Sequence, residues 1–239
     1  MKKITLLLFL LTVISVNLKA QKLRANLYAM YAFDDKFESY YNDYIYYHGK
    51  IVGGLRGGIG LEYMLRPNKG IELLWLHQST KAPTYYRPDG FAEKYEDFDL
   101  TLDYAMVAGE SYVRNATGKL EGFGGLMLGA GFINIKNPST SESSSATKFA
   151  WGIRLGANIW ASSRIGIKLQ GDLLSLVQGA GGGLYFGTGG AGAGISTYST
   201  MYQFGLGGGL TFKIGSSEPK PAAAPAPAPP PSTPPPVNK

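Results

Sequence analysis

The chain has 239 residues and a formal charge of +6, with 33 glycines, 16 tyrosines, two histidines and no cysteine. The absence of cysteine excludes a disulfide framework and thiol chemistry. Two histidines do not favour a His-based metal cluster, and the basic residues form no stripe of the kind that binds nucleic acid. Only 17% of the residues are charged, which is low for the surface of a soluble domain. We expect no metal, no cofactor and no nucleic-acid partner.

Residues 1–20 have the layout of a secretory signal. Lys2 and Lys3 precede an apolar run, Ile4–Val16, and Ala20 places a small residue at the expected cleavage point before Gln21. The alternative is a retained anchor, but the run is shorter than the roughly 20 apolar residues that a spanning helix needs. Cleavage also removes Lys19, so the formal charge falls from +6 to +3. We therefore expect an exported protein.

The mature chain then alternates apolar and polar residues with a period of two, the signature of a β-strand that faces two environments. The runs begin at Leu23, Ile51, Ile71, Phe98, Leu120, Phe149, Ile165 and Tyr202. Each is long enough for the roughly 9–11 residues that cross a bilayer at a tilt. In the fourth run, one face carries Asp99, Thr101 and Asp103, and the other is apolar, with Phe98, Leu100, Leu102, Tyr104 and Met106. Leu74 and Leu76 break the pattern of the third run.

The connections between these runs take turns, short and long. The short ones are 66–70, 114–119 and 161–164, and the long ones are about 34–50, 81–97, 137–148 and 177–199. This is the pattern of an outer-membrane barrel with brief periplasmic turns and extended extracellular loops. The sheet must close, since hydrocarbon cannot form hydrogen bonds with the backbone N–H and C=O groups of an open edge. We predict a closed antiparallel eight-stranded up-and-down transmembrane β-barrel over residues 21–215, with both mature ends in the periplasm.

The polar faces of the runs carry charges that we expect inside the barrel. A soluble, lipocalin-like barrel would need the reverse arrangement, with apolar side chains inside. Acids and bases on neighbouring strands then neutralise one another and plug a narrow lumen. The same groups would also permit a proton relay or a pair of catalytic carboxylates, but we favour the structural network. The expected members are Arg56, Glu62, Glu72, Asp103, Glu121, Arg154, Lys168, Asp172 and Lys213.

With its signal, its strands and its last run, the chain resembles the small outer-membrane barrel family of OmpX and the OmpA transmembrane domain over residues 22–215. The last run has Gly209 followed by Phe212 and Ile214, which looks like the terminal signature read by the barrel-assembly machinery. Family members often place an aromatic residue at the end of that strand and stop there, whereas this chain continues. The resemblance implies a partner in the assembly machinery and a surrounding of outer-membrane lipid and lipopolysaccharide.

Residues 216–239 are a low-complexity segment rich in proline and alanine. Such a segment favours an extended polyproline II spacer and cannot bury a core. It resembles the hinge that follows the OmpA barrel, without the domain expected after it. It is either an unstructured periplasmic tail or a docking peptide for a periplasmic protein, because preformed polyproline loses little entropy on binding.

His77-Gln78-Ser79 resembles the His-x-Ser element of the PagL family of lipid A deacylases. Alternation places His77 and Ser79 on the lipid-facing side of the third run, where a hydrolase of lipid needs its base and nucleophile. Thr80 stands where that family has asparagine, and the element lies in a different part of the chain. The alternative is an interfacial histidine beside Trp75 that contacts headgroups.

Five tyrosines gather in the first long connection: Tyr40, Tyr41, Tyr44, Tyr46 and Tyr47. They suit an aromatic girdle at the membrane boundary, or stacking on glycans or on a partner protein. The sequence as a whole favours a non-catalytic outer-membrane protein with a structural or interaction role through its loops and tail. A lipid A hydrolase and a narrow porin-like channel are the alternatives.

Overall fold

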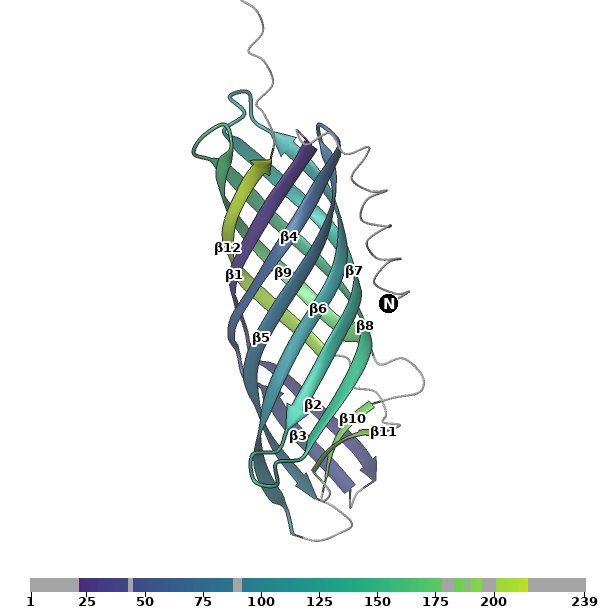
Figure 1. Cartoon of the computed structure of the whole chain (residues 1–239). Coiled ribbons are helices and arrows are strands. Elements are labelled where there is room, and N and C mark those ends of the chain that lie inside the picture. The colour runs from purple at the N-terminus through teal and green to yellow at the C-terminus, as the bar shows by residue number, and fades with distance from the viewer. Residues whose placement is uncertain are drawn as a thin grey trace, which may run out of the picture.

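The computed structural model describes residues 22–42, 45–87, 92–177, 183–187, 190–194 and 201–214. Within these residues, eight antiparallel strands close into one ring (Figure 1). In ring order they are β1 (Leu23–Ala32), β4 (Gly54–Arg66), β5 (Lys69–Arg87), β6 (Lys94–Arg114), β7 (Leu120–Lys136), β8 (Ser143–Trp160), β9 (Ile165–Val177) and β12 (Met201–Ile214). The first and last strands close the ring, with a register from Leu23↔Ile214 to Ala32↔Gly205. The predicted closed eight-stranded barrel is confirmed.

No helix among the described residues is long and apolar enough to cross a membrane.

The two ends of the barrel differ in their connections. At one end, which we call the turn end, neighbouring strands are joined by Pro67-Asn68, residues 115–119 and residues 161–164. The start of β1 and the end of β12 also lie there (Figure 1, top). In the middle turn Gly118 has a φ of 68°, a backbone that suits glycine, and its N–H donates to Asn115 O at 3.0 Å. The short connections therefore fall where the sequence predicted them. The opposite end is the loop end.

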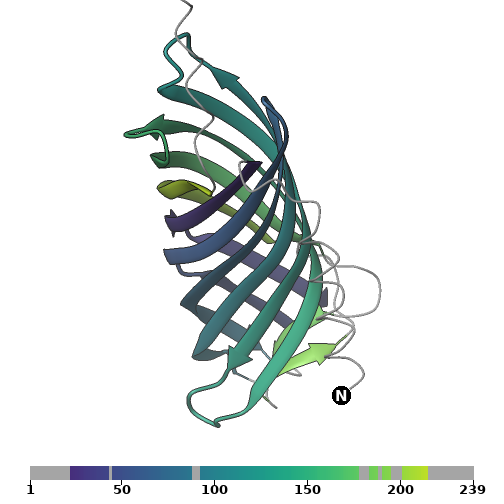
Figure 2. The ribbon, with the colours of Figure 1, turned by 45° about the horizontal axis from the view of Figure 1, so that its top comes forward.

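At the loop end the expected long connections are largely strand. β5 to β8 have between 17 and 21 residues, about twice what a bilayer requires. A hairpin of β2 (Asp35–Asn42) and β3 (Ile45–Ile51) extends the wall by pairing with β5, and β10 (Gly183–Gly187) pairs with β11 (Gly190–Gly194). Figure 2 shows the strands running obliquely around the barrel. Continued strand pairing provides hydrogen-bond partners for the backbone N–H and C=O groups, so these regions keep sheet structure.

The half of the barrel near the turns, the turn half, is apolar outside and charged inside. Leucine, isoleucine and valine side chains stand out from the wall. Examples are Leu55 at 71% exposed, Leu155 at 70% and Leu73 at 64%. The inside holds charged groups with almost no exposure, such as Glu72 and Arg154.

The other half, the loop half, has the opposite polarity. Phe98, Leu102 and Tyr104 point inward and are almost completely buried, and they pack in an apolar cluster with residues of β5, β7 and β9. The alternate positions of β6 face outward and include Asp99 and Asp103. The inside of the tall wall is thus mainly apolar, as in a soluble barrel.

This reversal corrects the interpretation of the fourth run. We assigned Asp103 to the lumen and the alternate apolar residues from Phe98 to Met106 to the lipid-facing side, and both assignments are wrong. The alternation of β6 was correct, but its sense is reversed because this stretch lies in the loop half. Ile51 is likewise buried in β3 and is not the start of a lipid-facing strand. Leu74 and Leu76 belong to the same inner cluster.

A ring of aromatic side chains marks the boundary between the two halves on the outer face. Tyr31 packs edge-on against Phe33 at 5.3 Å, and Phe33 stacks on Phe204 at 5.5 Å. On the far side of the barrel Trp75 stacks on Phe132 at 6.0 Å. Phe149, Trp151 and Tyr202 continue the ring. Aromatic rings at such a level are typical of a membrane–water interface.

Candidate functional site

The turn half of the lumen is built around Glu72 of β5 and Arg154 of β8. The Glu72 carboxylate accepts hydrogen bonds from Asn26 Nδ2 at 2.7 Å and Tyr28 Oη at 2.5 Å, and from Arg154 Nη2. Arg154 also contacts the Glu110 carboxylate. Both Glu72 and Arg154 are fully buried. Inward glycines make room for them, since a Cβ on Gly60 would overlap the Glu72 carboxylate.

Closer to the turns, a second group is centred on Glu121 of β7. Arg24 donates two hydrogen bonds to its carboxylate, at 3.0 and 3.1 Å, and Arg114 Nε donates one at 2.6 Å. Asn158 Nδ2 adds another at 3.1 Å. Two-pronged guanidinium–carboxylate pairing is among the strongest hydrogen bonding available to side chains. This layer closes the turn end of the lumen.

The remaining charges fill the gaps between these groups. Glu62 accepts from Tyr112 Oη at 2.5 Å and lies 3.8 Å from Arg24. The ammonium of Lys168 lies 4.2 Å from the ring centre of Phe123, a cation–π contact.

At the two limits of the network lie Lys213 and Arg56. Near the turns, Lys213 Nζ is 3.8 Å from the ring centre of Trp160. Towards the loop end, Arg56 Nη2 donates to Asp172, on the side of the apolar cluster that faces the turns. The network and the apolar cluster together fill the inside of the barrel.

Eight of the nine predicted lumen residues therefore face inward, and Asp103 does not. Five further inner residues were not among the predicted lumen residues: Arg24, Asn26, Glu110, Tyr112 and Asn158. Arg24 and Asn26 alternate with apolar residues in the first run, so pattern alone was enough to find them. Glu110 and Tyr112 were lost because β6 was assigned the wrong faces.

Asp103 instead forms part of a polar row on the outer face. His77 Nδ1 lies 2.8 Å from Asp103 Oδ1, and the two residues are directly opposite in the register of β5 and β6. Ser79 is the next outward residue on β5, opposite Thr101. The predicted outward position of both His77 and Ser79 is correct. A histidine oriented by a carboxylate, with a hydroxyl nearby, has the residue types of a hydrolytic site.

The outer face of the loop half continues as a polar surface beyond this row. The Lys81 ammonium lies 3.3 Å from Asp97 and 3.4 Å from Asp99. A shallow hollow of about 290 Å³ opens between β6, β7 and β8. Its outward lining residues are Asp99, Thr101, Asn134, Lys136, Ser143 and Ser145. This surface offers hydroxyl, amide and charged groups to a polar ligand.

The β2–β3 hairpin is tied to the barrel by two adjacent aspartates. Asp34 accepts from Lys50 Nζ and from the N–H of Gly53, both at 2.7 Å, and these contacts lower its pKa. Asp35 accepts from the N–H of Tyr202 at 2.9 Å. Burial raises the pKa of Asp35 to about 6. The hairpin therefore contacts β12 through the Asp35 carboxylate.

Two further predictions concern particular residues. Tyr44 lies outside the described residues, as do the side chains of Tyr40, Tyr41, Tyr46 and Tyr47, which belong to the β2–β3 hairpin. Gly209, Phe212 and Ile214 lie on the last strand, where Ile214 pairs with Leu23 and closes the ring. Residues 1–21 and 215–239, which hold the expected signal and tail, lie outside the described part as well.

Within the described residues no three His, Asp or Glu side chains are grouped so as to hold a metal ion.

Comparison with known proteins shows likeness in fold only. The chain is similar to the crystal structure of outer membrane protein OprG from Pseudomonas aeruginosa, with a TM-score of 0.54 and 11% identity over 81% of this chain and 96% of that one. It is also similar to Neisserial surface protein A, with a TM-score of 0.52 and 10% identity over 81% of this chain and 97% of that one. No family model and no curated protein sequence matches. The shared architecture is the small eight-stranded barrel of outer-membrane proteins.

Proposed function

We propose that this chain is a non-catalytic interaction protein anchored in a bacterial outer membrane. The observation that carries the proposal is the reversal of polarity along the barrel. The turn half suits hydrocarbon, because its outer face is apolar and its charges are enclosed and paired. The loop half suits water, because its outer face is polar and its inside is mainly apolar. The turn end and both chain termini then lie in the periplasm.

The height of the wall supports a role at the cell surface. With 21 residues at about 3.3 Å each and a tilt of about 45°, β6 rises roughly 50 Å, against about 25 Å for the apolar band of such barrels. About half of the wall therefore stands outside the membrane. Its polar outer face and the β2–β3 hairpin are the surfaces that we assign to lipopolysaccharide sugars or to a surface partner.

The filled lumen argues against the porin-like alternative. Conduction needs a continuous water path, and the charged network and the apolar cluster occupy the described interior. Channel-forming barrels with a water-filled lumen have about 16 strands. Planar-bilayer recordings on the mature chain should show no reproducible single-channel steps.

Single cysteines test the proposed topology directly, since the native chain has none. We expect a membrane-impermeant maleimide to label Ser145→Cys on intact cells. Leu61→Cys, in the apolar belt, should stay unlabelled until the membrane is dissolved. Thr117→Cys, in a turn, should be labelled only after the outer membrane is permeabilised. Equal labelling of Leu61→Cys and Ser145→Cys on intact cells would refute the membrane anchor. Labelling of Thr117→Cys on intact cells would refute the orientation.

The His77–Asp103 contact favours a second candidate function, hydrolysis of a lipid ester at the membrane surface. Asp103 orients the ring of His77, and Ser79 supplies a hydroxyl on the same face just above the aromatic ring. Mass spectrometry of lipid A from overexpressing cells distinguishes the two functions. Unchanged lipid A is expected from the interaction protein. A missing acyl chain that returns with His77→Ala and Ser79→Ala, but not with Thr101→Ala, would establish the hydrolase.

Three further assignments belong to the same proposal. Cleavage after Ala20 releases the signal, and Gly209, Phe212 and Ile214 guide the last strand to the barrel-assembly machinery. Residues 216–239 act as a periplasmic spacer that can dock a protein partner. A pull-down with a peptide of residues 216–239 identifies that partner, and an alanine- and serine-rich peptide of equal length is the control.

A further inference from the structure

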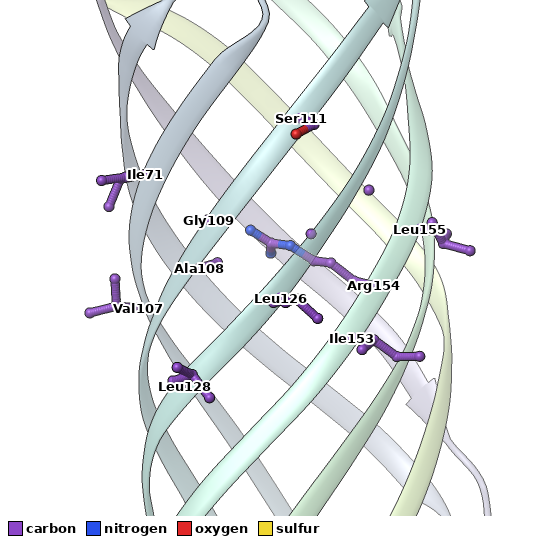
Figure 3. Close-up of a pocket in the computed structure, with 12 residues that line it drawn as sticks. Ile71, Val107, Ala108, Gly109, Ser111, Leu126, Leu128, Ile153, Arg154 and Leu155 are labelled. Atoms are coloured by element: carbon purple, nitrogen blue, oxygen red, sulfur yellow. The ribbon is translucent and has the colours of Figure 1, made fainter.

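The outer face of the turn half contains a groove of about 740 Å³ (Figure 3). It lies over β6 and β7, between Ile71 and Val107 on one side and Ile153 and Leu155 on the other. The lining is mainly apolar, and Ser111 and Arg154 are its polar residues. The groove lies within the belt that we assign to the membrane, so its surroundings are lipid.

The shape of the groove follows from small residues at successive outward positions. In the strand register Ser111 stands opposite Gly124, and Gly109 stands opposite Leu126. Around them the wall carries large side chains, including Leu128 and Leu155. A Cβ added at Gly109 would meet no heavy atom within 4 Å. At Gly124 the Leu155 side chain occupies that place, with its Cδ2 2.9 Å from where a Cβ would lie. The groove is therefore open above Gly109 and bounded by Leu155.

One end of the groove is polar and points to the turns. Lys69, directly opposite Ser111 in the register, donates a hydrogen bond to its Oγ at 3.2 Å. Among the described residues, the exposed charges around the turn end are basic: Lys22, Arg66, Lys69, Arg114, Lys119 and Arg164. The acids near this end, Glu62, Glu110 and Glu121, are buried in the lumen. A cation and a hydroxyl thus stand where an apolar groove meets a basic rim.

We propose that this groove is a binding site for one phospholipid of the periplasmic leaflet. An acyl chain lies over Gly109, beside Leu155, and the phosphate is held by the Lys69 ammonium and the Ser111 hydroxyl. The proposal rests on the proposed membrane orientation and adds a specific ligand to it. A second copy of the barrel is less suited, because a two-fold contact through this face would bring the two Lys69 side chains to the same height.

Filling the groove provides the test. Gly109→Leu places a side chain in the open space, and Gly57→Leu is the matched control. Gly57 also faces outward, on β4 away from the groove, and a Cβ there would meet only Tyr28 O at 3.8 Å. Both variants should fold as the native chain does, which the heat-dependent gel shift of barrels verifies.

Native mass spectrometry of the mature full-length chain, titrated with dimyristoylphosphatidylglycerol in detergent, measures binding. We expect one retained phospholipid, weakened about tenfold or more in Gly109→Leu, which is about 1.4 kcal/mol, and unchanged in Gly57→Leu. Lys69→Gln should weaken binding and remove its dependence on salt.

Equal retention in Gly109→Leu and the native chain overturns the proposal, and so does a dimer that Gly109→Leu abolishes. Stronger retention of lipopolysaccharide than of the phospholipid overturns the choice of ligand. Cysteine labelling that supports the membrane topology, together with unaltered retention in Gly109→Leu, defeats this site and leaves the proposed function standing.

Discussion

The turn half and the loop half are built from the same strands, yet they place opposite kinds of side chain inside. Strand β6 shows this within one element. Near the turns its inward residues are Glu110 and Tyr112 and its outward residues include Val113, whereas near the loops Leu102 is inward and Asp103 outward. The strand geometry is unchanged from one half to the other. The environment outside the wall therefore decides which face is apolar.

Each half solves a different problem of burial. Apolar residues in the turn half contribute little to closing the barrel from inside, so the lumen is held by paired charges and hydrogen bonds. In the loop half the hydrophobic effect acts as in a soluble protein, and the core lies inside. The first half is sensitive to the loss of one partner of an ion pair, and the second to cavities.

The largest effect is expected from breaking the charged network. Glu72→Ala removes one of the two carboxylates that contact Arg154 and deprives Tyr28 of an acceptor. Removing one partner of a buried pair costs about 3–5 kcal/mol. Urea unfolding in detergent micelles should show this loss. A change below about 1 kcal/mol would mean that the interior is hydrated and weakly coupled.

A pair of lysine substitutions on the outer face locates the boundary between the halves. Ile59→Lys, in the belt, should destabilise the inserted barrel by about 2–4 kcal/mol, as expected for a cation facing lipid near the midplane. Thr147→Lys, an outward residue of the loop half, should have almost no effect. Unfolding from lipid vesicles measures both, and equal costs would contradict the assignment of the loop half to water.

In the loop half, neighbouring residues of β6 should respond in opposite ways. Leu102→Ala opens a cavity in the inner cluster and should cost about 2–4 kcal/mol. Thr101→Ala, one residue away on the outer face, should change stability by less than about 0.5 kcal/mol. The same micelle unfolding experiment applies. A larger cost for Thr101→Ala would show that the apolar face is turned outward after all.

The smallest effect concerns pH and the hairpin. Burial raises the pKa of Asp35 to about 6, above the value near 4 of an unfolded chain, so the native state binds a proton more tightly. Its contribution to docking is therefore most favourable at low pH and falls as the pH rises towards 6 and beyond. In NMR spectra of the micelle-bound protein, the chemical shift of the Tyr202 amide should change with a midpoint near pH 6, and Asp35→Asn should abolish that change. A Tyr202 amide that titrates equally in Asp35→Asn would assign the effect to another group.

Much of the candidate site could be predicted from the sequence. The two faces of a strand in the barrel wall meet different surroundings, so the alternation of apolar and polar residues indicates which residues share a face. Arg56, Glu62, Glu72 and Glu121 were placed inside by pattern alone. The error at Asp103 arose because alternation separates two faces without saying which is inner. The pairing of Glu72 with Arg154 joins strands that are not neighbours in the ring, and no local pattern predicts that contact.

The sequence by itself determined the eight strands of the ring and the tight turns, since period-two alternation and turn residues are local properties of the chain, whereas the strands in the predicted long connections were not foreseen. Only the tertiary structure decided that the wall reverses its polarity partway up, that His77 meets Asp103 on the outside, and that glycines of two strands adjoin to form a groove. Those features depend on register and on height along the barrel axis. Both are set by how eight strands align with one another and not by any one of them.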